Sequence, residues 1–219
     1  MKKIFLLLIF LILNISNSSA RSNHARSYGG FEASYIQYND RNNELANYYT
    51  SSYGGKNFVN SSNAITSGRL FFGYKFLKIF DFEIGLSEST NFNYYIYGFT
   101  KNYENYEING TFKYNGLDYS AILRPFYNHE LNNFFIRAGG NFYIEKNDIL
   151  MTRNSINGQK IITNEQNYNY GYGYVLGAGY DFPYRENFDF RLSYNYLYNV
   201  ANLNQPFNHV YSIGFLNKF

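Results

Sequence analysis

Charged residues that could form ion pairs recur in runs of this sequence where apolar and polar residues alternate. In each run the charges fall on the face that carries glycine and serine, opposite the face of tyrosine, phenylalanine and leucine. This small-residue face holds Glu32, Arg69, Glu83, Asp118, Arg124, Arg137, Asp181 and Arg191. Acids and bases confined in a narrow space must pair, because an unpaired buried charge is very costly. The same pairs could instead exchange partners and pass water or small ions.

Catalytic chemistry has little support in the residue pattern. The chain has 3 histidines and no cysteine. His24 precedes the first expected strand and His129 lies in an expected turn, which leaves His209 as the single candidate. Ser212 is three residues away, but no GxSxG elbow or other catalytic motif supports the pair. No metal-ligand cluster is present either, so we expect no enzyme, no metal and no cofactor.

The elements that position the charges are expected to be β-strands, because a period of two is the signature of a strand with two unlike faces. In the clearest run the even positions are almost all aromatic or aliphatic, and the odd positions are mostly glycine or polar. Eight such runs occur, at residues 31–36, 68–76, 81–87, 117–124, 134–145, 168–182, 188–198 and 210–219.

The connections between these runs alternate in length. The long, polar ones are residues 39–65, 91–110, 146–167 and 199–208, and the short ones are 77–79, 127–133 and 183–187. Pro125, Pro183 and Pro206 lie in or beside connections, where a missing backbone donor does least harm. Short turns at one end and long loops at the other are typical of outer-membrane barrels. The sequence therefore predicts an all-β fold, an eight-stranded antiparallel transmembrane up-and-down β-barrel.

A soluble barrel of the lipocalin type is the alternative, with the apolar face lining a ligand cavity. The rings on residues 168–182 would overfill such a narrow lumen, whereas glycine, serine and paired charges suit one. The chain has 26 Tyr, 22 Phe and no Trp, and an AT-rich genome would explain part of that bias. Tyrosine is favoured where one end of the side chain is apolar and the other is wet. The placement of the rings favours the membrane barrel.

The first twenty residues are expected to be a signal peptide. Lys2 and Lys3 precede an apolar run from Ile4 to Ile15, and Ser18-Ser19-Ala20 supplies small residues for cleavage after Ala20. An uncleaved membrane helix is the alternative, but a bilayer span needs about 20 residues. We thus expect a signal peptide at 1–20 and a barrel domain at 21–219. The formal charge of +3 gives no electrostatic case for nucleic acid.

Several short motifs resemble the transmembrane domain of OmpA-like outer-membrane proteins, and their order and spacing follow that family. They are Gly73-Tyr74 with Phe82-Glu83-Ile84-Gly85, Phe135-Ile136-Arg137-Ala138-Gly139-Gly140, Gly177-Ala178-Gly179-Tyr180-Asp181 with Arg191-Leu192-Ser193-Tyr194, and Gly214-Phe215-Leu216-Asn217-Lys218-Phe219. The resemblance covers essentially the mature chain. It implies a bacterial, Gram-negative outer-membrane location.

The resemblance also implies an interior ion-pair cluster that plugs the lumen and could act as a gate. Glu83, Asp181 and Arg191 match its acidic, acidic and basic members. A lysine position of the family falls on Leu123 or Arg124, and Arg124 has the inward parity. Arg137 belongs to the same inward set.

The resemblance further implies partners. Phe219 resembles the aromatic C-terminus that the outer-membrane insertion machinery reads, and membrane lipids and lipopolysaccharide would surround the barrel. The peptidoglycan-binding domain of larger members has no counterpart before the sequence stops at Phe219.

Three classes of function stay open at this point. The first is a structural outer-membrane barrel with surface loops that could contain a small gated pore. The second is a surface adhesin or host-interaction protein, because loops on a rigid scaffold often carry recognition. The third, less favoured, is a lipid-modifying enzyme that would depend on His209. No motif names a surface ligand.

Overall fold

The computed structural model describes residues 26–38, 41–53, 55–62, 64–100, 104–126, 131–154, 158–199 and 208–219. These residues form α2 (Arg41–Tyr53) and ten strands: β1 (Ser27–Tyr38), β2 (Asn57–Ser61), β3 (Ala64–Leu77), β4 (Phe80–Ser89), β5 (Phe92–Phe99), β6 (Asn105–Leu123), β7 (Phe134–Asn154), β8 (Lys160–Arg185), β9 (Phe188–Asn199) and β10 (Asn208–Lys218). The expected cleavage after Ala20, together with His24 and His129, lies outside the described residues.

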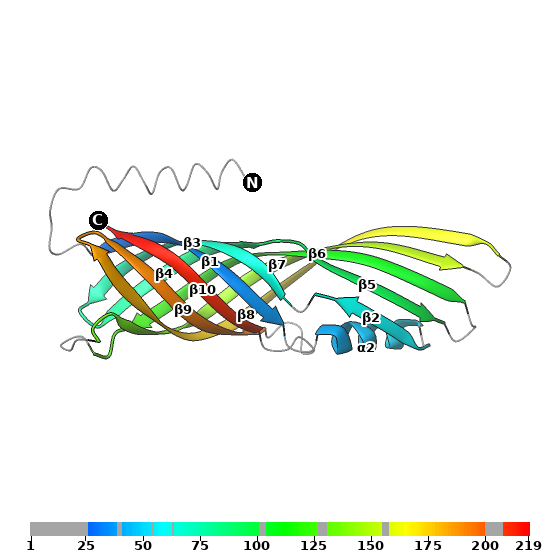
Figure 1. The fold of residues 1–219 in the computed structure, drawn as a ribbon, viewed down its shortest axis with the longest axis horizontal. Coiled ribbons are helices and arrows are strands. Elements are labelled where there is room, and N and C mark those ends of the chain that lie inside the picture. Colours follow the sequence, from blue (N-terminus) through cyan, green and yellow to red (C-terminus); the bar gives the residue numbers. More distant parts are fainter. Residues whose placement is uncertain are drawn as a thin grey trace.

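Eight of the strands close into a ring (Figure 1). The order is β1, β3, β4, β6, β7, β8, β9 and β10, with β10 hydrogen-bonded back to β1 and β6 to β7. Every pairing in the ring is antiparallel. The predicted eight-stranded up-and-down barrel is therefore confirmed.

The two faces of the ring differ as the alternation predicted. On β9, Arg191 is fully buried while its neighbour Leu192 is 48% exposed. The same reversal of a soluble protein's pattern occurs on the other ring strands, with apolar side chains outside and polar side chains inside. An apolar exterior is stable only against lipid. Among the described residues, no helix has the length and apolar character to cross a membrane.

The expectation that the long connections are polar loops was wrong for three of the four, and residues 200–207 of the fourth lie outside the described residues. Residues 39–65 contain α2 and β2, and residues 91–110 contain β5 and the start of β6. Residues 146–167 hold the outer halves of β7 and β8, which continue past the ring and pair from Lys146↔Tyr168 to Asn154↔Lys160. Asparagine is frequent in these stretches, so the alternation of apolar and polar residues that indicates a strand could not be recognised. Both faces there carry polar residues, because no lipid requires one face to be wholly apolar.

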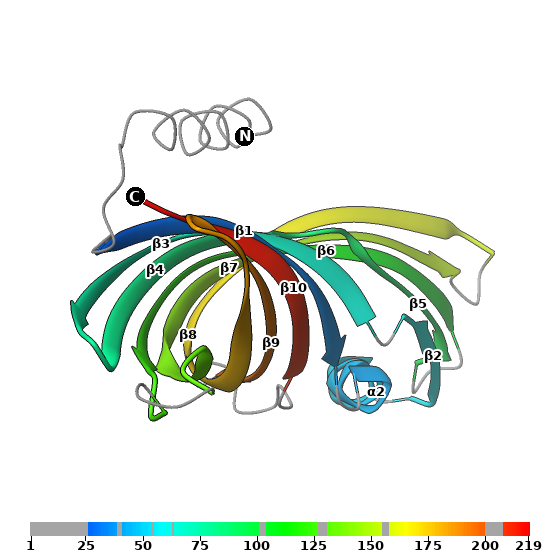
Figure 2. The ribbon, with the colours of Figure 1, turned by 60° about the vertical axis from the view of Figure 1, so that its left-hand side comes forward.

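The outer strands and α2 form a small unit at one end of the barrel. β5 pairs with the outer half of β6, and β2 pairs with β5. Figure 2 shows α2 beneath the arch that β5, β6 and β2 form. The Asn57 side chain on β2 donates a hydrogen bond to the Ala46 carbonyl of α2 (2.9 Å). Backbone pairing thus holds this unit to the same sheet as the ring.

One apolar core, here called the cap, joins this outer unit to the barrel mouth. Its buried members are Ile36, Leu45, Tyr49, Ile65, Phe92, Tyr94, Ile96, Tyr106, Ile108, Phe112 and Val210. Leu45 and Tyr49 come from α2, whereas Ile36 and Val210 come from inward positions of ring strands. The Phe92 and Phe112 rings stack at 4.4 Å. The cap therefore lies across the outer mouth of the barrel.

Candidate functional site

Glu83 and Arg191 lie at the centre of the barrel interior. They come from β4 and β9, which are not neighbours in the ring, so their contact crosses the lumen. Arg191 Nη1 donates to Glu83 Oε1 at 2.5 Å, and both side chains are 0% exposed. Arg191 also donates from Nε and Nη2 to the two oxygens of Asp181, at 2.7 and 3.0 Å. This bidentate geometry is the strongest form of arginine–carboxylate pairing.

Two further arginines approach Glu83 from the outer side. Arg137 Nη2 lies 2.7 Å and Arg69 Nη2 lies 3.4 Å from Glu83 Oε2. Arg69 also binds Glu32 at 2.7 Å and Asp118 at 2.6 Å. Glu83 is therefore shared by three guanidinium groups, each of which has other contacts.

On the inner side Arg124 joins two acids. Its Nη2 lies 2.7 Å from Asp181 and its Nε 3.1 Å from Asp81. Leu123, the other residue at this position of the resemblance, is 42% exposed on the outside. All five residues that the sequence singled out for the interior cluster, Glu83, Arg124, Arg137, Asp181 and Arg191, are thus brought together by direct or shared contacts.

Asp81 and Tyr28 belong to the cluster although they were not among the expected residues. Asp81 is 0% exposed, and Tyr28 donates from its hydroxyl to Glu83 (3.0 Å) and to Asp81 (3.3 Å). The alternation that selected Glu83 also selects Asp81, two positions earlier on the same strand. Tyr28 precedes residues 31–36, the first alternating run, so the alternation did not assign it to either face.

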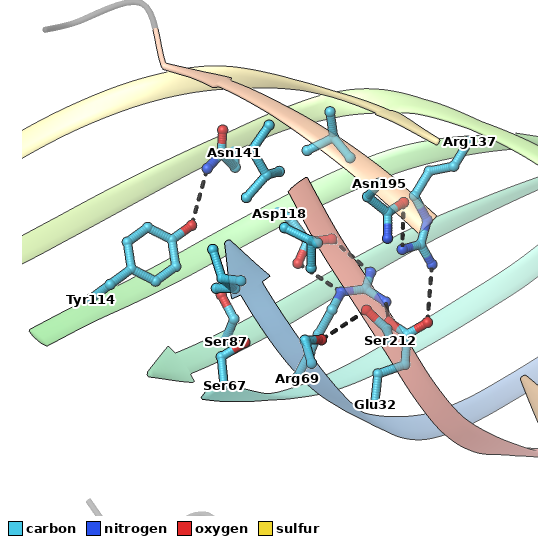
Figure 3. Close-up of a pocket in the computed structure, with 15 residues that line it drawn as sticks. Glu32, Ser67, Arg69, Ser87, Tyr114, Asp118, Arg137, Asn141, Asn195 and Ser212 are labelled. Carbon is cyan, nitrogen blue, oxygen red and sulfur yellow. Dashed lines mark hydrogen bonds and ion pairs between the residues drawn. The ribbon is translucent and has the colours of Figure 1, made fainter. Parts of the chain in front are cut away.

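Two separate cavities flank the Glu83–Arg191 contact. The outer cavity, of about 60 Å³, is lined by Glu32, Arg69, Asp118 and Arg137 among others (Figure 3). The inner cavity, of about 140 Å³, is lined by Tyr28, Lys75, Arg124, Asp181 and Lys218 among others. Neither Glu83 nor Arg191 lines either of these two cavities, and each contacts residues on both sides. The pair therefore forms the partition between them.

The outer cavity also has an apolar boundary. Ile36, Leu197 and Val210 line it, and the same three side chains belong to or pack against the cap. The outer cavity is thus a small polar chamber between the cap and the ion pairs.

The candidate catalytic pair is not brought together. His209 accepts or donates a hydrogen bond with the Tyr194 hydroxyl at 2.6 Å, whereas the Ser212 hydroxyl meets that of Ser34 at 2.8 Å inside the barrel. Their side chains therefore lie on opposite faces of β10. In the part of the chain that the structure describes, no three His, Cys, Asp or Glu residues are grouped as a metal site.

Phe219 follows directly after β10. Its backbone N–H donates to the Ser27 carbonyl at 2.9 Å, and its ring lies 6.1 Å from that of Phe72. Phe219 thus fastens the last residue of the chain to the beginning of β1.

A closed antiparallel ring with an apolar exterior and a charge-paired interior defines a transmembrane β-barrel of the outer-membrane class. The family model for the OmpA-like transmembrane domain matches residues 22–219, and the chain belongs to this family. It is an outer-membrane protein of Gram-negative bacteria. No curated protein matches the sequence.

Solved structures that are similar to the chain include the following three. Ail, the attachment invasion locus protein of Yersinia pestis, is 14% identical, with 89% of this chain and 99% of that chain covered and a TM-score of 0.42. Neisserial surface protein A is 13% identical, with coverage of 88% and 97% and a TM-score of 0.38. OprG from Pseudomonas aeruginosa is 16% identical, with coverage of 89% and 96% and a TM-score of 0.41.

Proposed function

We propose that this protein is a structural outer-membrane barrel whose lumen is closed at rest and whose outer strands are held at the cell surface. The observation that carries the proposal is the fully buried Glu83–Arg191 pair, which separates the two internal cavities. Opening a continuous path requires at least one of these charges to lose its partner in a medium of low polarity, which is costly. The family model that matches the chain describes a transmembrane domain.

Planar-bilayer recording of the refolded protein tests this proposal. The wild type is expected to show no stepwise conductance. Frequent, reproducible openings of the wild type would contradict a closed lumen. They would favour the small gated pore, and Arg124→Ala would then change how often the pore opens. That second function has its own support, because Glu83 already contacts three arginines and could exchange one for another.

Variants separate the contributions of the ion pairs and the cap. Arg191→Ala leaves the cap intact, so we expect any conductance increase to be small. Combining it with Leu45→Ala and Tyr49→Ala, which weaken the cap, should give a larger increase than either change alone. Lys56→Ala, in the outer unit but outside the cap, is the control. A full opening by Arg191→Ala alone would mean that the cap does not seal the mouth.

A surface-recognition function has a separate observation in its favour. In the described residues, β8 pairs with β7 along its whole outer half, whereas its pairing with β9 begins only at Gly173↔Asn199. Residues 160–172 therefore present an open sheet edge, to which an extended polypeptide could add as a further strand. Bulges and prolines, which protect many edges, do not occur between residues 160 and 172.

A shortened variant tests the edge. Residues 149–165 are replaced by an Asn-Gly turn, which suits a two-residue hairpin. This change removes residues 160–165 of the edge and leaves the parts of β7 and β8 that lie in the ring unchanged. Cells that display the wild type should adhere to immobilised extracellular polypeptides better than cells that display the shortened form at equal surface levels. Equal adherence would remove this candidate without touching the closed-lumen proposal.

A further inference from the structure

Two lysines face each other on the outside of the molecule just beyond the barrel wall. Lys113 on β6 lies directly opposite Lys146 on β7, and Lys146 lies opposite Tyr168 on β8. Their parity places them on the lipid-facing side, in line with Leu117 and Phe142. Like charges directly opposite each other destabilise a sheet. Glu88 and Asp148 offset part of this repulsion, and a negative group that met both ammonium groups would offset the rest.

The height of these residues follows from the strand register. Starting at Tyr172, the hydrogen-bonded row around the ring is Phe142, Leu117, Leu86, Leu70, Phe31, Phe215, Phe190 and Phe182. All its members are apolar or aromatic, and it returns to β8 ten residues nearer the inner end (182 minus 172). At roughly 3.3 Å per residue and a tilt of about 40°, ten residues span about 25 Å. That is the height of the apolar band of an outer-membrane barrel.

The lysines and tyrosines lie just above this band. Tyr168 is four residues beyond Tyr172, the highest member of the row, and lies about 10 Å above it. Lys146 is four residues beyond Phe142, which is one strand lower on the row, and lies about 7 Å above Tyr172. Tyr168 is 51% and Tyr170 is 72% exposed. At this level a barrel meets the polar headgroups of the outer leaflet and not the acyl chains.

Acidic neighbours neutralise the lysines only in part. Lys113 pairs with Glu88 towards the membrane, and Lys146 pairs with Asp148 (2.8 Å) towards the outside. Both lysine side chains remain 36% exposed, and they lie directly opposite each other on adjacent strands. A phosphate has enough oxygens to meet both ammonium groups at once, and the tyrosine rings offer flat faces and hydroxyls suited to sugars.

We propose that Lys113, Lys146, Tyr168 and Tyr170 form a binding site, the headgroup patch, for a phosphorylated glycolipid of the surrounding outer leaflet. The patch is continuous with the lipid-facing wall, so a membrane glycolipid reaches it without leaving the bilayer. A soluble ligand would have no such access advantage. The site is independent of whether the lumen conducts.

Titration of the refolded protein in detergent with diphosphorylated and dephosphorylated lipid A tests the patch. Lys113→Gln with Lys146→Gln should weaken binding of the diphosphorylated lipid about thirtyfold, the loss expected for two lysines beside an anionic lipid surface. Binding of the dephosphorylated lipid should change little. Tyr168→Ser with Tyr170→Ser should weaken both lipids.

The matched control is Lys56→Gln with Lys160→Gln, which makes the same change of net charge away from the patch. Resistance to unfolding in cold detergent shows that each variant is a closed barrel. An equal loss in the control would mean that binding follows net charge alone. Unchanged affinity in the lysine pair variant would overturn the proposal, as would tighter binding of phosphatidylglycerol than of diphosphorylated lipid A.

Discussion

At the scale of single residues, the contact between Glu83 and Arg191 should appear as a coupling energy. Each single change to alanine leaves the partner charged and buried, which is expected to cost about 3–5 kcal/mol. The double variant leaves no uncompensated member of the pair and should recover part of that loss, with a coupling of about 1 kcal/mol or more. Urea unfolding in lipid vesicles measures all four corners of the cycle. Strictly additive losses would show that the two side chains do not interact.

Phe219 allows packing and recognition to be distinguished. The ring of Phe215 contacts those of Phe31 (6.1 Å) and Phe188 (5.5 Å), whereas the ring of Phe219 lies near Phe72 alone among the ring contacts described. On packing alone, Phe215→Ala should therefore be the more harmful change. We predict the reverse for outer-membrane levels, with deletion of Phe219 the more harmful, because the insertion machinery is proposed to read this end. Fractionation and immunoblotting give the comparison, and levels of Phe215→Ala as low as or lower than those of the deletion would contradict the prediction.

The interior residues could be predicted because two independent signs agree at each position. The place of a residue in the alternation and the charge of its side chain both assign it to the inward face. Arg137 and Asp181 had to face inward once their neighbours were assigned to lipid. The partners could not be predicted in the same way. Arg124 contacts Asp181 across 57 residues of sequence, and that distance depends on the ring closing with one particular register.

At the scale of elements, α2 and the strands beside it should unfold separately from the ring. Leu45 is buried in the cap, and Leu45→Ala is expected to cost about 2–3 kcal/mol through lost contacts and an added cavity. That loss of stability should be confined to the outer unit, because its strands have fewer neighbouring strands than those of the ring. Hydrogen exchange should accelerate in β2 and β5 and stay unchanged in β1 and β10. Lys56→Ala, in the outer unit but outside the cap, is the control, and uniform acceleration would contradict a separate unit.

The ring strands were predictable and the outer elements were not, for a physical reason. Lipid demands an uninterrupted apolar face, so strands such as β8 and β9 keep a strict alternation. The outer unit is solvated on several sides, and β2 and β5 need only a few buried side chains such as Phe92 and Ile96. α2 has polar residues around most of its circumference, which leaves little helical period to detect.

At the scale of the whole molecule, the short turns and the outer unit lie at opposite ends. Protease sites inserted at the Gly158 turn and at the Lys78-Ile79 turn test the orientation. We expect cleavage of intact cells at the first site only, because the proposed topology puts the short turns in the periplasm. Permeabilised cells should be cut at both. Cutting at Lys78-Ile79 in sealed cells would reverse the orientation.

The pairing of β1 with β10, from Tyr28↔Lys218 to Tyr38↔Asn208, has a consequence for the order of folding. The seam joins the first and last described strands, so the native contacts of highest sequence separation are also the ones that complete the ring. Folding with such non-local contacts is slow, and until the seam forms both edge strands lack hydrogen-bond partners that lipid cannot supply. The chain therefore cannot fold into the bilayer strand by strand as it emerges. It must wait unfolded in the periplasm until β10 is available, and for that interval its survival depends on whatever keeps the forty-six phenylalanine and tyrosine rings of residues 21–219 (20 and 26, without Phe5 and Phe10) apart.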